Sequence, residues 1–224
     1  MTRKIFVISG LGADHAVFHK LDLPGYELVH VKWVPTIKGE SLGGYAKRLL
    51  PQITDENPIL LGLSLGSMLV LEVAQLIETK CVISLSSITS YKELPGRYKF
   101  AGGLRLQKVL PVYWFAKGNR FTHWLFGTKN TADNAVLDEV FNRLDKDFLY
   151  WALNAVLSWD NAILPNNIVR IHGTADLVLP AVKRVKYDAL IKGGTHLMLL
   201  DQHEEVSNAI LNLLNKKLEA DLLT

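Results

Sequence analysis

A serine placed between two glycines is the residue whose setting most suggests chemistry. Residues 62–66 read Gly-Leu-Ser-Leu-Gly with Ser64 in the middle, directly after a short apolar run. The residues that follow are apolar on nearly every side, which is typical of a buried helix. On a sharp strand-to-helix turn, glycines two residues away avoid clashes and leave the serine hydroxyl clear of the sheet. The pattern predicts a nucleophilic Ser64, although a serine here could instead be only a helix N-cap.

Two further residues have the types that would activate this serine. A serine hydroxyl is a weak nucleophile until a base removes its proton, and the base needs an acid that fixes its tautomer. His196 follows two glycines after the last apolar run, and Asp176 lies just after the run at residues 168–172. The carboxyl ends of parallel strands are where catalytic groups gather in open α/β sheets. We therefore predict a catalytic set of Ser64, Asp176 and His196, with Asp160 as the alternative acid.

The elements that must position these residues follow from the hydropathy pattern. Six short apolar runs indicate strands, and several are apolar almost throughout, as in strands buried on both faces. They cover residues 4–9, 27–33, 59–63, 81–85, 168–172 and 186–191. Helical patterns lie between them, at residues 41–50, 65–77 and 204–218. This alternation predicts an α/β fold with a doubly wound, mainly parallel sheet of about six strands.

Residues 91–160 break the alternation of strands and helices. The stretch shows no clear strand, and it contains four of the chain's five tryptophans. Helical spacing appears at residues 136–144 and again at residues 148–157, with Asp147 as a candidate N-cap. We predict a helical cap over residues 91–160, inserted into a core made of residues 1–90 and 161–224. Its aromatic side chains would pack on the core, line an apolar pocket, or do both.

Composition argues against several other classes of protein. The chain has 224 residues, 49% of them hydrophobic, which suits one large domain with a substantial core. Its net charge is only +3, so no nucleic-acid partner is expected. The single cysteine, Cys81, cannot form an internal disulfide or a multi-cysteine zinc site. No apolar run is long enough to span a bilayer or to serve as a signal peptide, so we expect a cytoplasmic protein.

The residues after the first apolar run allow two rival interpretations. Gly10 and Gly12 could begin a dinucleotide-binding fingerprint, but the third glycine would fall at position 15, where His15 stands. His15 and His19 have the i, i+4 spacing of a helical metal pair, yet the glutamate that usually accompanies such a pair is absent. We therefore interpret the two histidines as part of a surface helix face.

Four segments, taken together and in order, resemble the α/β-hydrolase superfamily. They are residues 9–14, 62–67, 172–176 and 193–196. The family often has a histidine before the first glycine of the first segment, where this chain has Ser9. The resemblance implies an α/β-hydrolase fold in which the backbone N–H groups of Leu11 and Leu65 form the oxyanion hole. Such preorganised donors stabilise the charge that develops on a carbonyl oxygen.

The resemblance also implies an activity. It favours a serine hydrolase that cleaves a carboxylic ester or a related acyl bond of a small molecule through an acyl-enzyme, with no metal or organic cofactor. Other cofactor-free reactions occur in the superfamily, namely thioester, lactone and C–C bond hydrolysis, haloperoxidase or perhydrolase activity, and hydroxynitrile cleavage. A receptor-like protein that binds its ligand with little turnover is an alternative from another class. Neither the physiological substrate nor the oligomeric state follows from the sequence.

Overall fold

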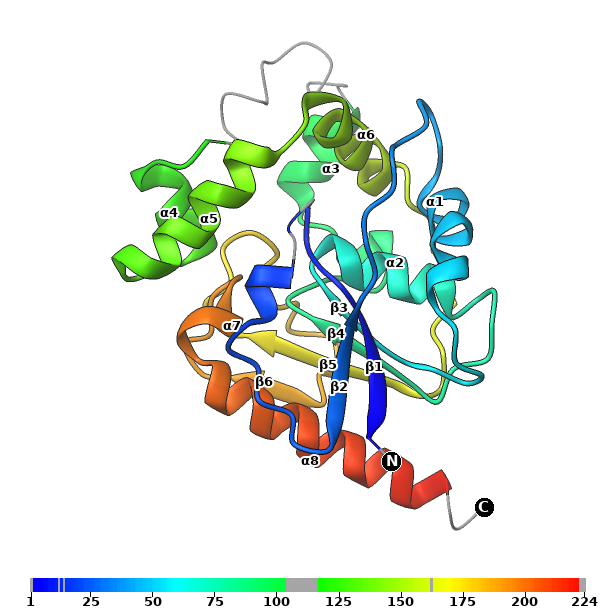
Figure 1. The fold of residues 1–224 in the computed structure, drawn as a ribbon. Coiled ribbons are helices and arrows are strands. Elements are labelled where there is room, and N and C mark those ends of the chain that lie inside the picture. The colour runs from blue at the N-terminus through cyan, green and yellow to red at the C-terminus, as the bar shows by residue number, and fades with distance from the viewer. Residues whose placement is uncertain (1, 12, 14, 104–116, 162, 222–224) are drawn as a thin grey trace.

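Six strands form a single, fully parallel sheet in the computed structural model of the chain (Figure 1). The structure describes residues 2–221 except 12, 14, 104–116 and 162, so Gly12 and Trp114 lie outside the described residues. The sheet order is β2-β1-β3-β4-β5-β6. The strands are β1 (Arg3–Ile8), β2 (Tyr26–His30), β3 (Ile59–Leu63), β4 (Cys81–Leu85), β5 (Ile168–Gly173) and β6 (Ala189–Ile191). The predicted doubly wound sheet is confirmed.

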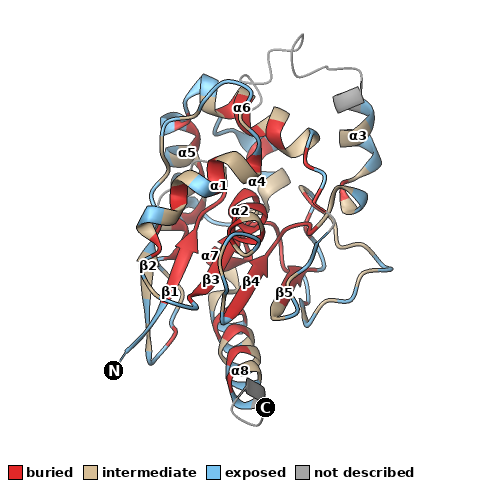
Figure 2. Cartoon of the chain, turned by 90° about the vertical axis from the view of Figure 1, so that its right-hand side faces the viewer, coloured by how far each residue is buried: buried red, intermediate tan, exposed pale blue. Residues whose placement is uncertain are grey.

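Alternate side chains of the strands point to opposite faces of the sheet, so the core has two halves. In β1, Ile5 and Val7 pack in one half with α8 (His203–Asp221), while Phe6 and Ile8 pack in the other. That second half also contains α1 (Leu42–Leu49) and α2 (Leu65–Val73). Figure 2 shows the central strands and α2 as the most buried elements of the chain. Helices therefore cover both faces, which explains why the strands are apolar almost throughout.

The helices on this core begin largely where the sequence predicts. Ser41 caps α1 by accepting a hydrogen bond from the Gly44 N–H at 3.1 Å, and the apolar side of α1 is buried. Helix α2 starts at the predicted residue but ends at Val73, four residues before the predicted end. Short helical turns complete the core. They are the 3₁₀ turns η1 (His15–Phe18), η2 (Leu50–Gln52) and η3 (Tyr91–Glu93) and the short helix α7 (Met198–Asp201).

Among the residues that the structure describes, four α-helices lie between β4 and β5, in the upper part of Figure 1. They are α3 (Gly96–Gly103), α4 (Arg120–Phe126), α5 (Thr131–Arg143) and α6 (Lys146–Leu157). The predicted cap of α6 was wrong, because the N-cap is Asp145, which accepts a hydrogen bond from the Phe148 N–H at 3.0 Å. Asp147 lies in the first turn instead. Every helix in the described ranges is too short or too polar to cross a lipid bilayer.

Candidate active site

Ser64 stands on a strained turn between β3 and α2. Its φ of 54° and ψ of −118° lie in a region that residues other than glycine rarely adopt. A Cβ atom on Gly62 would collide with backbone at the start of α2, and one on Gly66 would collide with carbonyl groups at the end of β1. Glycines at both positions therefore allow the close approach that the turn requires, as the spacing predicts.

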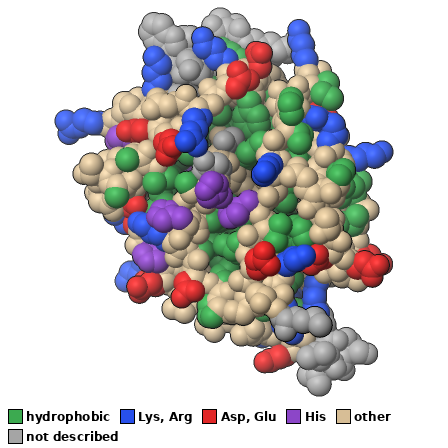
Figure 3. Space-filling model, viewed as in Figure 1, with side chains coloured by type: hydrophobic (Ala, Val, Ile, Leu, Met, Phe, Trp, Pro, Cys, Tyr) green, Lys and Arg blue, Asp and Glu red, His purple; other side chains and the backbone are tan. Residues whose placement is uncertain are grey.

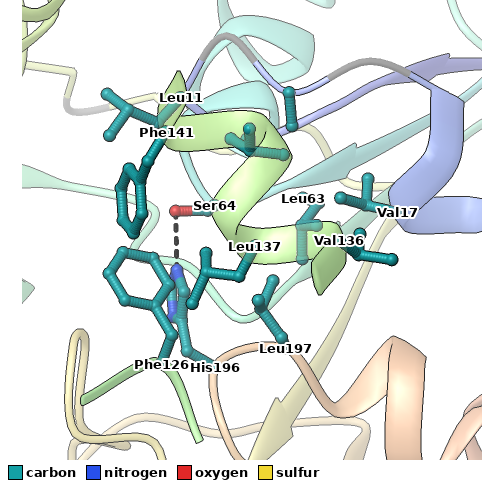
Figure 4. A pocket seen from close by; sticks show the side chains of 13 residues that line it. Leu11, Val17, Leu63, Ser64, Phe126, Val136, Leu137, Phe141, His196 and Leu197 are labelled. Carbon is teal, nitrogen blue, oxygen red and sulfur yellow. Dashed lines mark hydrogen bonds between the residues drawn. The ribbon is translucent and has the colours of Figure 1, made fainter. Parts of the chain in front are cut away.

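The Ser64 hydroxyl is directed at a histidine and does not cap the helix. Although Ser64 occupies the N-cap position of α2, its side chain makes no capping hydrogen bond. Its Oγ lies 2.9 Å from Nε2 of His196, with the two groups facing each other in Figure 4. A serine whose only role was capping would instead accept a hydrogen bond from an N–H of the first helical turn. The geometry thus favours the nucleophile over the N-cap interpretation.

Asp176 holds the other side of the His196 ring. Nδ1 of His196 lies 2.8 Å from Oδ2 of Asp176, and the two residues are only 2% and 3% exposed. The second carboxylate oxygen accepts hydrogen bonds from the backbone N–H groups of Val178 at 2.9 Å and Leu179 at 2.8 Å. The structure therefore brings the three predicted residues together. The alternative acid, Asp160, is exposed beyond the end of α6.

The electrostatics of Asp176 suit an ionised acid. Burial would raise the pKa of its carboxyl group, but the electrostatic interaction with His196, the hydrogen bond to that ring and the Leu179 N–H together hold that pKa below its ordinary value. Asp176 therefore stays ionised at neutral pH. An ionised carboxylate accepts the Nδ1 proton of His196, which leaves Nε2 able to take a proton from Ser64.

His172, at the end of β5, is a further residue of this site. It is 1% exposed, and its Nε2 donates a hydrogen bond to the Leu179 carbonyl at 2.7 Å. The same nitrogen lies 3.5 Å from Oδ2 of Asp176. Burial lowers the pKa of His172, so the ring is neutral near pH 7. His172 thus holds the loop whose N–H groups support Asp176. In the sequence, His172 could have been recognised as a candidate by its position at the end of a strand, four residues before Asp176.

The two predicted oxyanion donors belong to segments that adjoin the serine. Leu65 is the first residue of α2, so its N–H is among those that a helix cannot satisfy internally. Leu11 follows Gly10, where an added Cβ would lie only 3.2 Å from Cβ of Ser64. Leu11 and Ser64 also line the same pocket. The assignment of these two N–H groups as oxyanion donors stays a prediction.

That pocket is apolar and lies at a reversal of strand order. The chain passes from β1 to β2 on one side of β1 and then returns to β3 on the other side. Ligands of open α/β sheets bind in the crevice outside the strand ends at such a point. The residues after β1 and β3 form one wall, while Phe126 of α4 and Phe141 of α5 belong to another. Hydrophobic side chains are visible near the middle of the face shown in Figure 3.

The histidine pair and the single cysteine lie in settings that suit structural roles. His15 and His19 are both exposed, as predicted for a surface face, but the helix is only the 3₁₀ turn η1, which ends at Phe18. Cys81 is buried within β4. Within the described part of the chain, no group of three or more His, Cys, Asp and Glu side chains is arranged to hold a metal ion.

Comparisons with known proteins agree with this fold. A model described as the alpha/beta hydrolase family matches residues 3–209. Curated protein sequences give no match. An esterase from Exiguobacterium antarcticum superimposes with a TM-score of 0.71 at 15% identity, covering 95% of this chain and 92% of that chain. A lipase-esterase related protein from Clostridium acetobutylicum superimposes with a TM-score of 0.64 at 21% identity, covering 95% of this chain and 94% of that chain.

A third solved structure carries a different activity in its name. A bromoperoxidase from Bacillus anthracis superimposes with a TM-score of 0.68 at 17% identity, covering 96% of this chain and 92% of that chain. At such identities, structural likeness establishes the fold, and the fold agrees with the one that the sequence resemblance implies.

Proposed function

Because the chain belongs to the alpha/beta hydrolase family, we propose that it is a serine hydrolase that cleaves a carboxylic ester or a related acyl bond. The observation that carries the proposal is the continuous series of contacts from Ser64 Oγ to His196 Nε2 at 2.9 Å and from His196 Nδ1 to Asp176 Oδ2 at 2.8 Å. A nucleophile, a base and an orienting acid in this arrangement perform acyl transfer on several unrelated folds. The esterase and lipase-esterase neighbours are consistent with it.

The proposed reaction has two halves, and in each half His196 first takes a proton and then gives it back. His196 takes the proton of Ser64 as the hydroxyl oxygen attacks the carbonyl carbon, and it then protonates the departing alcohol. Water next attacks the acyl-enzyme with His196 again as the base, which releases the acid and restores Ser64. The N–H groups of Leu11 and Leu65 stabilise the oxyanion in both steps, and loss of one such donor typically costs about 10²–10³-fold in kcat.

We also propose that residues 91–160 act as a cap over this site. Phe126 and Phe141 line the pocket beside Ser64, with ring centroids 5.4 Å apart, and the Phe126 ring lies 5.5 Å from that of His196. Trp151 of α6 is instead buried in the core half that contains α1 and α2. The aromatic side chains of the segment thus serve both as core and as pocket wall.

A fluorophosphonate probe, which reacts with activated serines, tests the proposal directly. Wild type should be labelled and should hydrolyse p-nitrophenyl esters, whereas Ser64→Ala should do neither. Ser158→Ala, which changes an exposed serine at the end of α6, is the matched control and should behave as wild type. If wild type is not labelled and turns over no ester, the proposal is wrong.

Cofactor-free haloperoxidase activity is a second candidate, because one structural neighbour is named a bromoperoxidase. This activity predicts labelling of Ser64 together with peroxide-dependent oxidation of bromide. Labelling combined with bromide oxidation, and without hydrolysis of any ester, would favour it over the ester hydrolase.

A further inference from the structure

We propose that the pocket beside Ser64 binds the acyl part of the substrate and accepts uncharged acyl groups of about two to four carbon atoms. This inference rests on the proposed function and adds a substrate class to it. Three properties of the pocket carry it, namely the chemistry of its walls, its volume and its closed end. Helix α5 sets the limit on chain length.

The walls of the pocket exclude charge. Apart from Ser64 and His196, every residue that lines it is a glycine or has an apolar side chain. A carboxylate or an ammonium group on the acyl chain would lose its hydration there without gaining a partner, which is strongly unfavourable. An acyl group made of CH₂ and CH₃ would lose only the water that covered its apolar surface. The substrate class that fits is therefore an ester of a simple aliphatic acid.

The volume of the pocket limits the length of that acid. The cavity measures about 40 Å³, and by the same measure about 10–15 Å³ holds one water molecule. About three to four non-hydrogen atoms therefore fit. The carbonyl oxygen would lie in the proposed oxyanion hole, so only the carbon atoms occupy the pocket, and the largest acyl chain that fits is butyryl. A longer chain would have to displace packed side chains, and protein interiors resist such overpacking.

One face of α5 provides the wall that sets this limit. Val136, Leu137, Val140 and Phe141 all line the pocket, at the spacing of neighbours on one side of a helix. Leu137 and Phe141 are 3% and 4% exposed and belong to the core, whereas Val136 and Val140 are only partly buried. The two valines are thus the positions where a change of size alters the pocket with the least damage to the core.

The start of α5 is fixed to the core, so this wall is held in place. Asp133, in the first turn of α5, is 1% exposed and receives the Lys20 ammonium group at 2.8 Å. The same ammonium group donates to the carbonyl of Leu200, in α7, at 2.7 Å. A buried carboxylate that lost this partner would pay a large desolvation cost. The anchor therefore resists outward movement of α5 to admit a longer chain.

The inner end of the pocket favours the acyl part over the alcohol part. Ala13, Val17 and Leu197 line the pocket and are 5%, 2% and 7% exposed, so this part of its wall belongs to the core, and we take it as the inner end. In Figure 4, Val17, Val136 and Leu197 all lie to the right of Ser64, on the side away from Phe126 and Phe141. The alcohol must leave before water attacks the acyl-enzyme, whereas the acyl group stays bound to Ser64. A closed apolar end therefore suits the group that stays.

The experiment measures kcat/KM along two ester series with purified wild type. The first series keeps p-nitrophenol and lengthens the acid from acetate through butyrate to octanoate. The second keeps acetate and lengthens the alcohol from methyl to octyl. We expect kcat/KM to fall by about tenfold or more between butyrate and octanoate, because overpacking costs that much, and to change less along the alcohol series. The p-nitrophenyl monoester of succinic acid should be cleaved far more slowly than the butyrate.

Variants of α5 test which residues set the limit. Val136→Ala and Val140→Ala should each raise the octanoate-to-butyrate ratio of kcat/KM, and Val140→Phe should restrict activity to acetate. Glu139→Ala changes an exposed side chain of the same helix and should leave the ratio unchanged. Wild type that prefers octanoate, or valine variants that change only the alcohol series, would overturn the inference while the proposed function stands. Absence of both labelling and ester turnover would instead defeat the proposed function.

Discussion

Replacement of Asp176 by Asn tests the relation between the acid and the base. Asn has nearly the same shape, and its amide oxygen can keep the hydrogen bonds from the Val178 and Leu179 N–H groups. Its amide nitrogen would then lie where Oδ2 now lies, 2.8 Å from Nδ1 of His196. Because an amide nitrogen only donates, Nδ1 must accept, and the ring proton moves to Nε2, which faces Ser64. His196 in that tautomer cannot take the serine proton.

The expected loss is large and specific. In a serine triad this wrong tautomer lowers kcat by about 10⁴-fold, which corresponds to about 5.4 kcal/mol of transition-state stabilisation at 1.36 kcal/mol per tenfold. The assay is kcat for p-nitrophenyl acetate, with thermal unfolding measured in parallel to show that Asp176→Asn still folds. Asp160→Asn is the control and should match wild type. The reasoning is refuted if Asp176→Asn keeps kcat within about tenfold of wild type or if Asp160→Asn is the variant that loses activity.

Other perturbations of the site should affect stability as well as activity. The pKa of Asp176 is lowered in the folded state, so its carboxylate should stabilise the fold at pH values above the ordinary Asp pKa of about 4. This stabilisation should be lost as the pH falls through the lower folded-state pKa. In urea unfolding at decreasing pH, the free energy of unfolding should therefore fall more steeply for wild type than for Asp176→Asn. His172→Ala removes the donor to the Leu179 carbonyl, so both Tm and kcat should fall, and His172→Gln, which can donate from a similar position, should recover part of each. Gly66→Ala places a Cβ against backbone carbonyl groups and should lower the free energy of unfolding by more than about 4 kcal/mol, whereas Gly96→Ala, with open space around it, should change it little.

The central strands, and the meeting of Ser64, Asp176 and His196 at their ends, could be predicted because burial leaves a clear pattern in the sequence. β3 and β4 are buried at every position, and their bounds match the predicted runs at residues 59–63 and 81–85. The edge strands β2 and β6 are unevenly buried and shorter than predicted. An edge strand packs against one neighbour only, so apolar residues mark its ends less sharply. The triad residues follow strands and glycines, which the sequence shows directly.

Contacts between distant segments could not be predicted in the same way. Asp145 and Asp147 both precede the apolar side of α6, and the backbone conformation decides that Asp145 becomes the cap. The face of α5 that turns toward Ser64 depends on the packing of Phe141 against Phe126. The role of His172 depends on where the Leu179 carbonyl comes to lie. Each of these results is a consequence of tertiary packing, which no local pattern of residues records.

The dispersal of the proposed triad along the chain links the site to the order of folding events. The hydrogen bond between Ser64 and His196 joins residues 132 positions apart, and it forms only when β3, β4, β5 and β6 lie in register. Closure of long loops and pairing of parallel strands are slow steps, whereas helices form rapidly. During refolding from denaturant, probe labelling of Ser64 should therefore return after the helical circular dichroism signal. The interval between the two signals would measure how long the sheet takes to assemble.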